Sequence, residues 1–181
     1  MRAPERRAYM NNRLVIIRFL GIRLAIYLSA VLVTYLLASV AATQSVISSL
    51  AKMGVGLSFS DRVAMTVQDI SGMAGMFLPM VAFGLLIAFL ATALICRYLD
   101  RWRIPLYIIA GAAALVCIHL ALNLAFGITP VAIARTIPGL LVQGVAGAVG
   151  GLLYVYLTLR FPAFSKDDTP EFLPEDFQIK S

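Results

Sequence analysis

The chain has 181 residues, of which 61% are hydrophobic and 13% are charged, and its formal net charge at pH 7 is +6. A soluble domain is roughly 45 to 50% apolar and about 25% charged, so this composition excludes an ordinary water-soluble fold. Because a helix of about 20 mostly apolar residues crosses a bilayer core, the four runs of that kind in the chain predict an all-α membrane protein with four transmembrane helices.

The four predicted transmembrane helices take up nearly half of the chain, and the rest is divided among loops and ends, which leaves no room for a separate soluble domain of usual size. They cover Leu24 to Ala42, Met76 to Cys96, Pro105 to Phe126 and Ile137 to Leu159. We therefore expect one transmembrane unit over residues 1–161 and a separate tail over residues 162–181. A cleaved secretion signal is the alternative for the first helix, with small residues at 39–41 before the cut, but the long segment in front of it favours a retained helix.

Basic residues are distributed unequally between the two ends of the predicted helices. Twelve of them precede the first helix, separate the second from the third, or follow the fourth, whereas Lys52, Arg62 and Arg135 lie in the other two loops. Basic loops stay on the cytoplasmic side during insertion, so we expect both termini in the cytoplasm, in a bacterial inner membrane. The positive charge also suits anionic membrane lipids, and no aromatic-basic pattern typical of nucleic-acid binding accompanies it.

The segment between the first and second helices, Thr43 to Gly75, is too long for a tight turn. We expect two short amphipathic helices in it, separated near Gly54 and Gly56, with Ser60 as the N-cap of the second. The apolar side of that second helix, which should rest on the outer membrane surface or on the bundle, consists of Val63, Val67 and Ile70.

Charged residues of the two outer loops form a candidate cluster. Arg62 and Asp69 lie seven residues apart, and Arg135 lies in the loop before the fourth helix. The three side chains could join the loops or hold a ligand. The simpler alternative is that these charges are solvated and at most hold the two loops together.

Polar residues inside the third and fourth helices form a second candidate cluster. His119 and Asn123 are one turn apart, and Gln143 lies at a comparable depth in the antiparallel fourth helix. An unsatisfied polar group in hydrocarbon is costly, so we expect these side chains to hydrogen-bond across the interface and specify helix pairing. The functional alternative is a path for a solute or a proton, since ionisable groups in membranes often mark such paths.

Small residues lie on one side of the fourth helix. At about 100° per residue, the same side carries Gly139, Gln143, Gly147, Gly150 and Gly151, which we call the glycine stripe. Small residues let helix backbones approach closely in lipid and gain van der Waals contact. The stripe therefore predicts close packing, against a neighbouring helix of the same chain or against another chain.

The tail over residues 162–181 has a different composition, with three prolines and five acidic residues. Such a segment cannot bury enough apolar surface to fold alone. Its apolar residues Phe172, Leu173 and Phe177 could dock on a cytoplasmic protein, and plain disorder is the alternative.

No catalytic signature is present in the sequence: it has no HExxH motif, no phosphate-binding glycine loop and a single histidine. Cys96 and Cys117 lack metal-ligand spacing, so we expect no enzyme activity, no cofactor and no metal site. Two functions remain. The first is an accessory or assembly subunit of a larger membrane complex, with a protein partner or a homo-oligomer in the membrane. The alternative is a small transporter or channel, which the absence of an internal repeat and the single proline inside a helix, Pro79, make the weaker hypothesis.

Overall fold

The structure, a computed structural model, describes residues 3–126 and 136–161. These residues form helices and no strand, which confirms the predicted all-α class for this part of the chain. The elements are α1 (Ala3–Lys52), α2 (Phe59–Cys96), a turn of 3-10 helix η1 (Asp100–Trp102), α3 (Arg103–Phe126) and α4 (Ile137–Arg160). Four helices are long and apolar enough to cross a membrane, so the chain is a multi-pass membrane protein.

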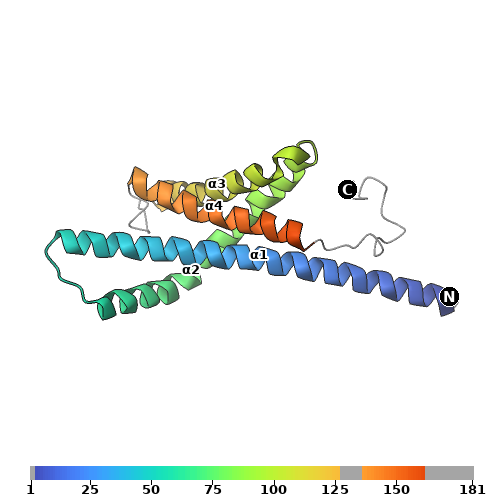
Figure 1. The fold of residues 1–181 in the computed structure, drawn as a ribbon, viewed down its shortest axis with the longest axis horizontal. Helices are drawn as coiled ribbons and strands as arrows, with labels where there is room; N and C mark the ends of the chain where they lie inside the picture. Colours follow the sequence, from blue (N-terminus) through green and yellow to red (C-terminus); the bar gives the residue numbers. More distant parts are fainter. Residues whose placement is uncertain (1–2, 127–135, 162–181) are drawn as a thin grey trace.

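The helices form a bundle in which each packs on two others. Going around the bundle, α1 contacts α2, α2 contacts α3, α3 contacts α4, and α4 contacts α1, with the α3–α4 interface the most extensive. The start of α1 and the end of α4 point to the same end of the molecule (Figure 1). Short connections between successive apolar helices give this antiparallel arrangement.

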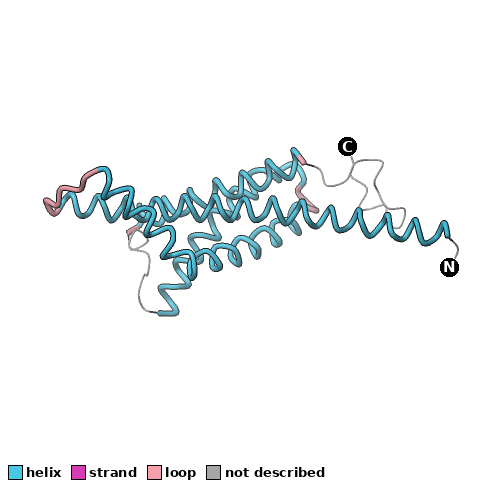
Figure 2. The backbone as a smooth tube through the Cα atoms, turned by 90° about the horizontal axis from the view of Figure 1, so that it is seen from below, coloured by secondary structure: helices cyan, strands magenta, loops and turns pink. Residues whose placement is uncertain are grey.

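The first two helices are much longer than predicted. α1 has 50 residues and α2 has 38, against 24 each for α3 and α4. At 1.5 Å per residue these lengths are about 75, 57 and 36 Å. Consequently α1 extends past the bundle at its N-terminal end, and the hairpin of α1 and α2 extends past it at the other end (Figures 1 and 2).

The two short helices expected between the first and second transmembrane helices do not exist as separate elements in the described chain. Their residues continue α1 as far as Lys52 and begin α2 at Phe59. The helix break is confined to the connection around Gly54, whose positive φ of 83° suits glycine. Gly72 and Gly75 lie inside α2 and do not end it.

The N-cap of α2 is Ser58, and the prediction of Ser60 was wrong. The Ser58 hydroxyl accepts a hydrogen bond from the Asp61 amide at 3.2 Å, and the Asp61 carboxylate accepts one from the Ser58 amide at 3.1 Å. This reciprocal capping box needs an acidic or amide side chain three residues after the cap. Ser58 has Asp61 at that position, whereas Ser60 would have Val63.

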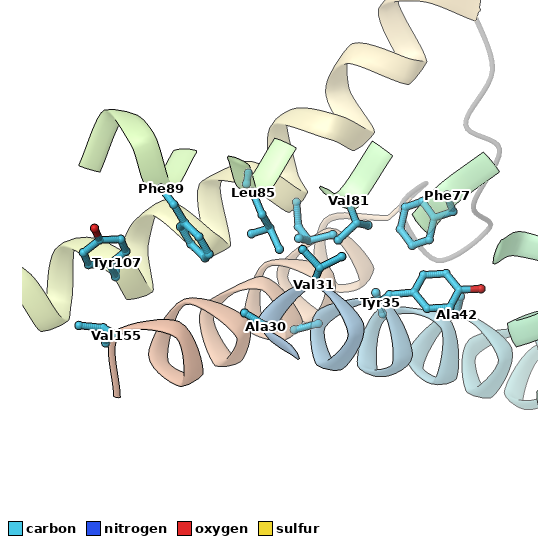
Figure 3. Packing of buried hydrophobic residues seen from close by; sticks show 14 of the residues in the cluster. Ala30, Val31, Tyr35, Ala42, Phe77, Val81, Leu85, Phe89, Tyr107 and Val155 are labelled. Atoms are coloured by element: carbon cyan, nitrogen blue, oxygen red, sulfur yellow. The ribbon is translucent and has the colours of Figure 1, made fainter. Parts of the chain in front are cut away.

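A row of α2 side chains fills the centre of the bundle. Phe77, Val81, Leu85 and Phe89 recur every four residues, are buried, and face side chains from the other helices (Figure 3). Pro79 lies inside α2 on its exposed side. In Figure 1 the first part of α2 runs beside α1, and its second part turns toward the start of α3. A proline removes one helical hydrogen bond, and such a change of direction is its usual effect.

Candidate functional site

The glycine stripe faces the inside of the bundle. All five of its residues are buried: Gly139, Gln143, Gly147, Gly150 and Gly151. Gly147 and Gly151 lie against the backbone of α3, and Gly150 lies against α1. The stripe therefore packs within the chain.

The closest approach of two backbones is between α3 and α4. A Cβ placed on Gly147 would overlap the carbonyl oxygen of Gly111, and one on Gly111 would overlap that of Gly147. One turn further along, a Cβ on Gly151 would overlap the carbonyl oxygen of Tyr107. Gly111 was not predicted, although the run of alanines that follows it is the kind of small-residue signal that marks such an interface.

Helix α1 approaches α4 through a threonine. A Cβ on Gly150 would overlap the Thr34 hydroxyl oxygen and would lie 3.3 Å from the Ala30 carbonyl oxygen. Thr34 is fully buried, and its hydroxyl has no hydrogen-bond partner in the described part of the chain. Gly150 therefore provides the space that a polar side chain of α1 occupies.

Gln143 hydrogen-bonds to α1. Its side-chain nitrogen donates to the backbone carbonyl of Ala38 at 3.0 Å, and the residue is completely buried. The partners expected from the sequence were His119 and Asn123. A backbone acceptor has no sequence signature, so Ala38 could not have been identified in advance.

His119 lies next to Gln143 inside the bundle. Its imidazole interacts with the Gln143 amide, but neither ring nitrogen meets the geometry of a hydrogen bond. The ring is 2% exposed and packs against Phe77, with ring centroids 5.7 Å apart. Asn123 lies one turn further along α3 and is exposed. The polar cluster therefore has two buried members, His119 and Gln143, and one at the surface.

Three hydroxyl groups of α1 bond to α2, and these bonds were not predicted from the sequence. The Tyr27 hydroxyl donates to the Ala82 carbonyl and the Tyr35 hydroxyl to the Ile70 carbonyl. The Thr43 hydroxyl donates to the Asp69 carboxylate at 2.8 Å. The donors are eight residues apart on α1, so at about 100° per residue each one is turned by roughly 80° from the one before it, and the three do not share one side of the helix. Their spacing therefore gives no signal from which the interface could have been found, and two of the three acceptors are backbone carbonyls, which have no sequence signature.

The candidate outer charge cluster is only partly within the described chain. Asp69 is half-buried against Thr43, whereas Arg62 is exposed. Arg135 lies outside the described residues, so the hypothesis of a cluster of Arg62, Asp69 and Arg135 stays a prediction. The tail residues Phe172, Leu173 and Phe177 also lie outside the described residues, and their docking stays a prediction.

Chemically reactive groups are sparse in the described part of the chain. It contains no group of three or more His, Cys, Asp or Glu residues arranged to hold a metal ion. Cys96 is buried, Cys117 is exposed, and neither is part of a disulfide. What the site offers is hydrogen bonding and close packing between helices. No protein-family model, curated protein or solved structure matches the chain.

Proposed function

We propose that the protein is an accessory or assembly subunit of a larger membrane complex. The observation that carries this proposal is the α1–α2 hairpin, which extends past α3 and α4 and carries exposed apolar side chains. Apolar patches that neither the protein nor lipid covers mark interaction surfaces. The hairpin is therefore the surface on which a protein partner docks.

The register between helices supports the position of the hairpin outside the bilayer. Gln143 is level with Ala38, and α4 begins at Ile137, so the outer end of α4 is level with about residue 44 of α1. From there α1 continues to Lys52, which adds about 12 Å. The side chains of Met53 and Phe59 at the tip are 70% and 82% exposed.

Because the glycine stripe is buried inside the bundle, a partner would have to bind to other surfaces of the protein. Gly147 and Gly150 contact α3 and α1, so another chain has no access to them without opening the bundle. Outside the lipid, the hairpin and the tail are the segments that we propose for docking of a partner. The exposed leucines along α1 at positions 24, 28 and 32 face lipid or a neighbouring helix in the same complex.

The distribution of arginines supports an orientation with both termini in the cytoplasm of a bacterial inner membrane. Described arginines at the end where α1 enters the bundle are Arg18, Arg23, Arg97, Arg101, Arg103 and Arg160. Lys52 and Arg62 lie at the opposite end. Basic residues are retained on the cytoplasmic side, so the hairpin faces the outer compartment in this proposal.

Purification in mild detergent tests the proposed function. The tagged full chain should retain a partner in fixed stoichiometry. Replacing Phe59 and Val67 together by serine should release an outer partner, whereas the matched control Gln68→Ser, on the same turns of α2, should not. Deleting residues 162–181 should release a cytoplasmic partner if the tail docks. A chain that purifies alone, with the same elution volume for all variants, would contradict the proposal.

Solute transport is the second candidate function, and the unpartnered polar atoms in the bundle favour it. Both ring nitrogens of His119 and the side-chain oxygen of Gln143 are buried without a hydrogen-bond partner in the described chain. Polar groups at this depth often mark solute or proton paths. If His119→Ala leaves the assembly intact but abolishes a flux measured in vesicles, transport is the function. If vesicles that contain the protein show the same flux as vesicles without it, transport is excluded for the solutes that were measured.

A further inference from the structure

Two arginines are partly buried at the end of the bundle where α1 enters it. Arg23 comes from α1 and Arg103 is the first residue of α3. Both are half-buried, and the Nε atom of each is buried without a hydrogen-bond partner in the described chain. A buried guanidinium N–H normally has an acceptor, because leaving a buried donor next to a charge unpaired is costly.

Both guanidinium groups lie within electrostatic range of the same tyrosine, Tyr107. The charges of both Arg23 and Arg103 act on the Tyr107 hydroxyl, and Tyr154 lies beside it. The rings of Tyr107 and Tyr154 are 5.2 Å apart, and Phe89 stacks on Tyr154 at 4.5 Å. Gly151, which lies against the Tyr107 backbone, allows this close approach of α3 and α4. Phe89, Tyr107 and Tyr154 thus form an aromatic cluster, and both arginines lie within electrostatic range of one of its members.

The position of Arg23 matches the headgroup zone. Gly150 faces the turn of α1 between Ala30 and Thr34, so Arg160, ten residues further along α4, is level with about residue 22 of α1. Arg23 therefore lies at the depth at which α4 ends. Its guanidinium also lies over the Phe19 ring, 5.4 Å from the centroid, which helps to fix its direction.

Acidic partners for these arginines are missing among the described side chains. The acidic side chains that the structure describes are Asp61 and Asp69, and both lie at the opposite end of the bundle, where they bond to Ser58 and Thr43. Among the described side chains, the entrance of α1 thus carries positive charge and two buried Nε–H donors that no described acceptor meets. An anion is the complement of such a site.

We propose that Arg23 and Arg103 bind the phosphate of an anionic phospholipid of the cytoplasmic leaflet. The site is partly open, because Arg23 and Arg103 are themselves half-buried and not fully buried, and an exposed aliphatic residue follows each of them in the sequence, Leu24 and Ile104. A row of exposed leucines continues from Leu24 along α1 to Leu28 and Leu32, parallel to the path of an acyl chain. Basic pockets between transmembrane helices at this depth suit lipid headgroups, and the guanidinium fork suits a phosphate.

Lipid retention by the purified full chain, measured by native mass spectrometry, tests the site. Phosphatidylglycerol, titrated into detergent solution, should bind at least roughly tenfold more tightly than phosphatidylcholine, as expected for charge-assisted hydrogen bonds. Arg23→Gln and Arg103→Gln should each remove most of this preference. Two controls should keep it: Arg18→Gln, an exposed arginine at the same end, and Arg62→Gln at the opposite end.

The conservative variants Arg23→Lys and Arg103→Lys keep the charge but lose the planar pair of N–H donors of the guanidinium. We expect their affinity for phosphatidylglycerol to lie between those of the unchanged protein and the glutamine variants. The lysine variants also allow the site to be tested if a glutamine variant does not give a monodisperse helical protein. Equal binding of both lipids would overturn the proposal. An equal loss of the lipid preference in Arg18→Gln would also overturn the proposal, because it would mean that positive charge attracts the lipid without a specific site. Displacement of bound lipid by millimolar inorganic phosphate would instead assign the site to a soluble phosphate compound.

Discussion

Gly111 of α3 and Gly147 of α4 lie against each other so that the Cα atom of each faces the carbonyl oxygen of the other. A Cβ lies about 1.5 Å from its Cα, so each Cα is within roughly 3.6 Å of the opposite oxygen. That separation is the range of weak Cα–H···O contacts. The pair therefore contributes reciprocal contacts that any side chain at either position would abolish.

Alanine substitutions in this pair should destabilise the bundle. Gly111→Ala and Gly147→Ala each force the α3 and α4 backbones apart, and overpacking of this kind costs about 1 to 3 kcal/mol. Gly144→Ala is the matched control in the same helix, because its Cβ would meet Val116 at an ordinary 3.4 Å. Unfolding in mixed detergent, followed by circular dichroism, measures the difference. Equal stability of the Gly144 and Gly147 variants would contradict the described α3–α4 packing.

The hydrogen bond from Gln143 to Ala38 should contribute little to stability. Gln143→Met keeps the side-chain volume and removes the donor together with an unpartnered buried oxygen. Interhelical hydrogen bonds in a membrane protein average about 0.6 kcal/mol, so we expect a loss of that order in the free energy of unfolding. The same detergent titration measures it. A loss above about 2 kcal/mol would mean that Gln143 has partners beyond Ala38, with His119 as the first to test.

Apolar runs identify the transmembrane helices of this chain because the bilayer imposes their length. The predicted third and fourth helices therefore agree with α3 and α4 to within a few residues. The outer parts of α1 and α2 were expected as separate short helices, and their continuity with the transmembrane helices was missed, because it depends on contacts such as that of Thr43 with Asp69 and not on apolar composition. Likewise the glycine stripe reveals that a backbone approaches α4, but only the tertiary structure identifies Gly111 and Thr34 as the groups that approach.

Two neighbouring serines should respond differently to alanine. Ser58→Ala removes the N-cap of α2 and its hydrogen bond with the Asp61 amide, which costs about 1 kcal/mol. Ser60→Ala removes a hydroxyl from the first helical turn and should change stability by much less. Amide hydrogen exchange at residues 61–64 reports this local difference. Faster exchange in the Ser60 variant than in the Ser58 variant would assign the cap to Ser60.

The contact between Thr43 and Asp69 should appear as coupling between α1 and α2. In a double-mutant cycle of Thr43→Val and Asp69→Asn, we expect a coupling free energy of about 0.5 to 1.5 kcal/mol. A hydrogen bond to a carboxylate that is half-buried supports a value in this range. Thr66→Val combined with Asp69→Asn is the control pair, because the Thr66 hydroxyl bonds within α2 to Arg62. Purely additive effects in the Thr43 cycle would mean that the two helices do not meet at this point.

The proposed orientation requires that the hairpin and the α2–α3 connection lie on opposite sides of the membrane. Lys52 lies at the end of α1 and Arg101 in the 3-10 turn, and both are exposed. After the native cysteines at 96 and 117 are replaced by alanine, single Lys52→Cys and Arg101→Cys variants can be labelled with a membrane-impermeant maleimide. In intact bacterial cells from which the outer membrane has been removed, Lys52→Cys should react. Arg101→Cys should react only after the membrane is permeabilised, because the basic connection is retained inside. The reverse pattern would place both termini outside and would move the arginines proposed to bind lipid to the outer leaflet.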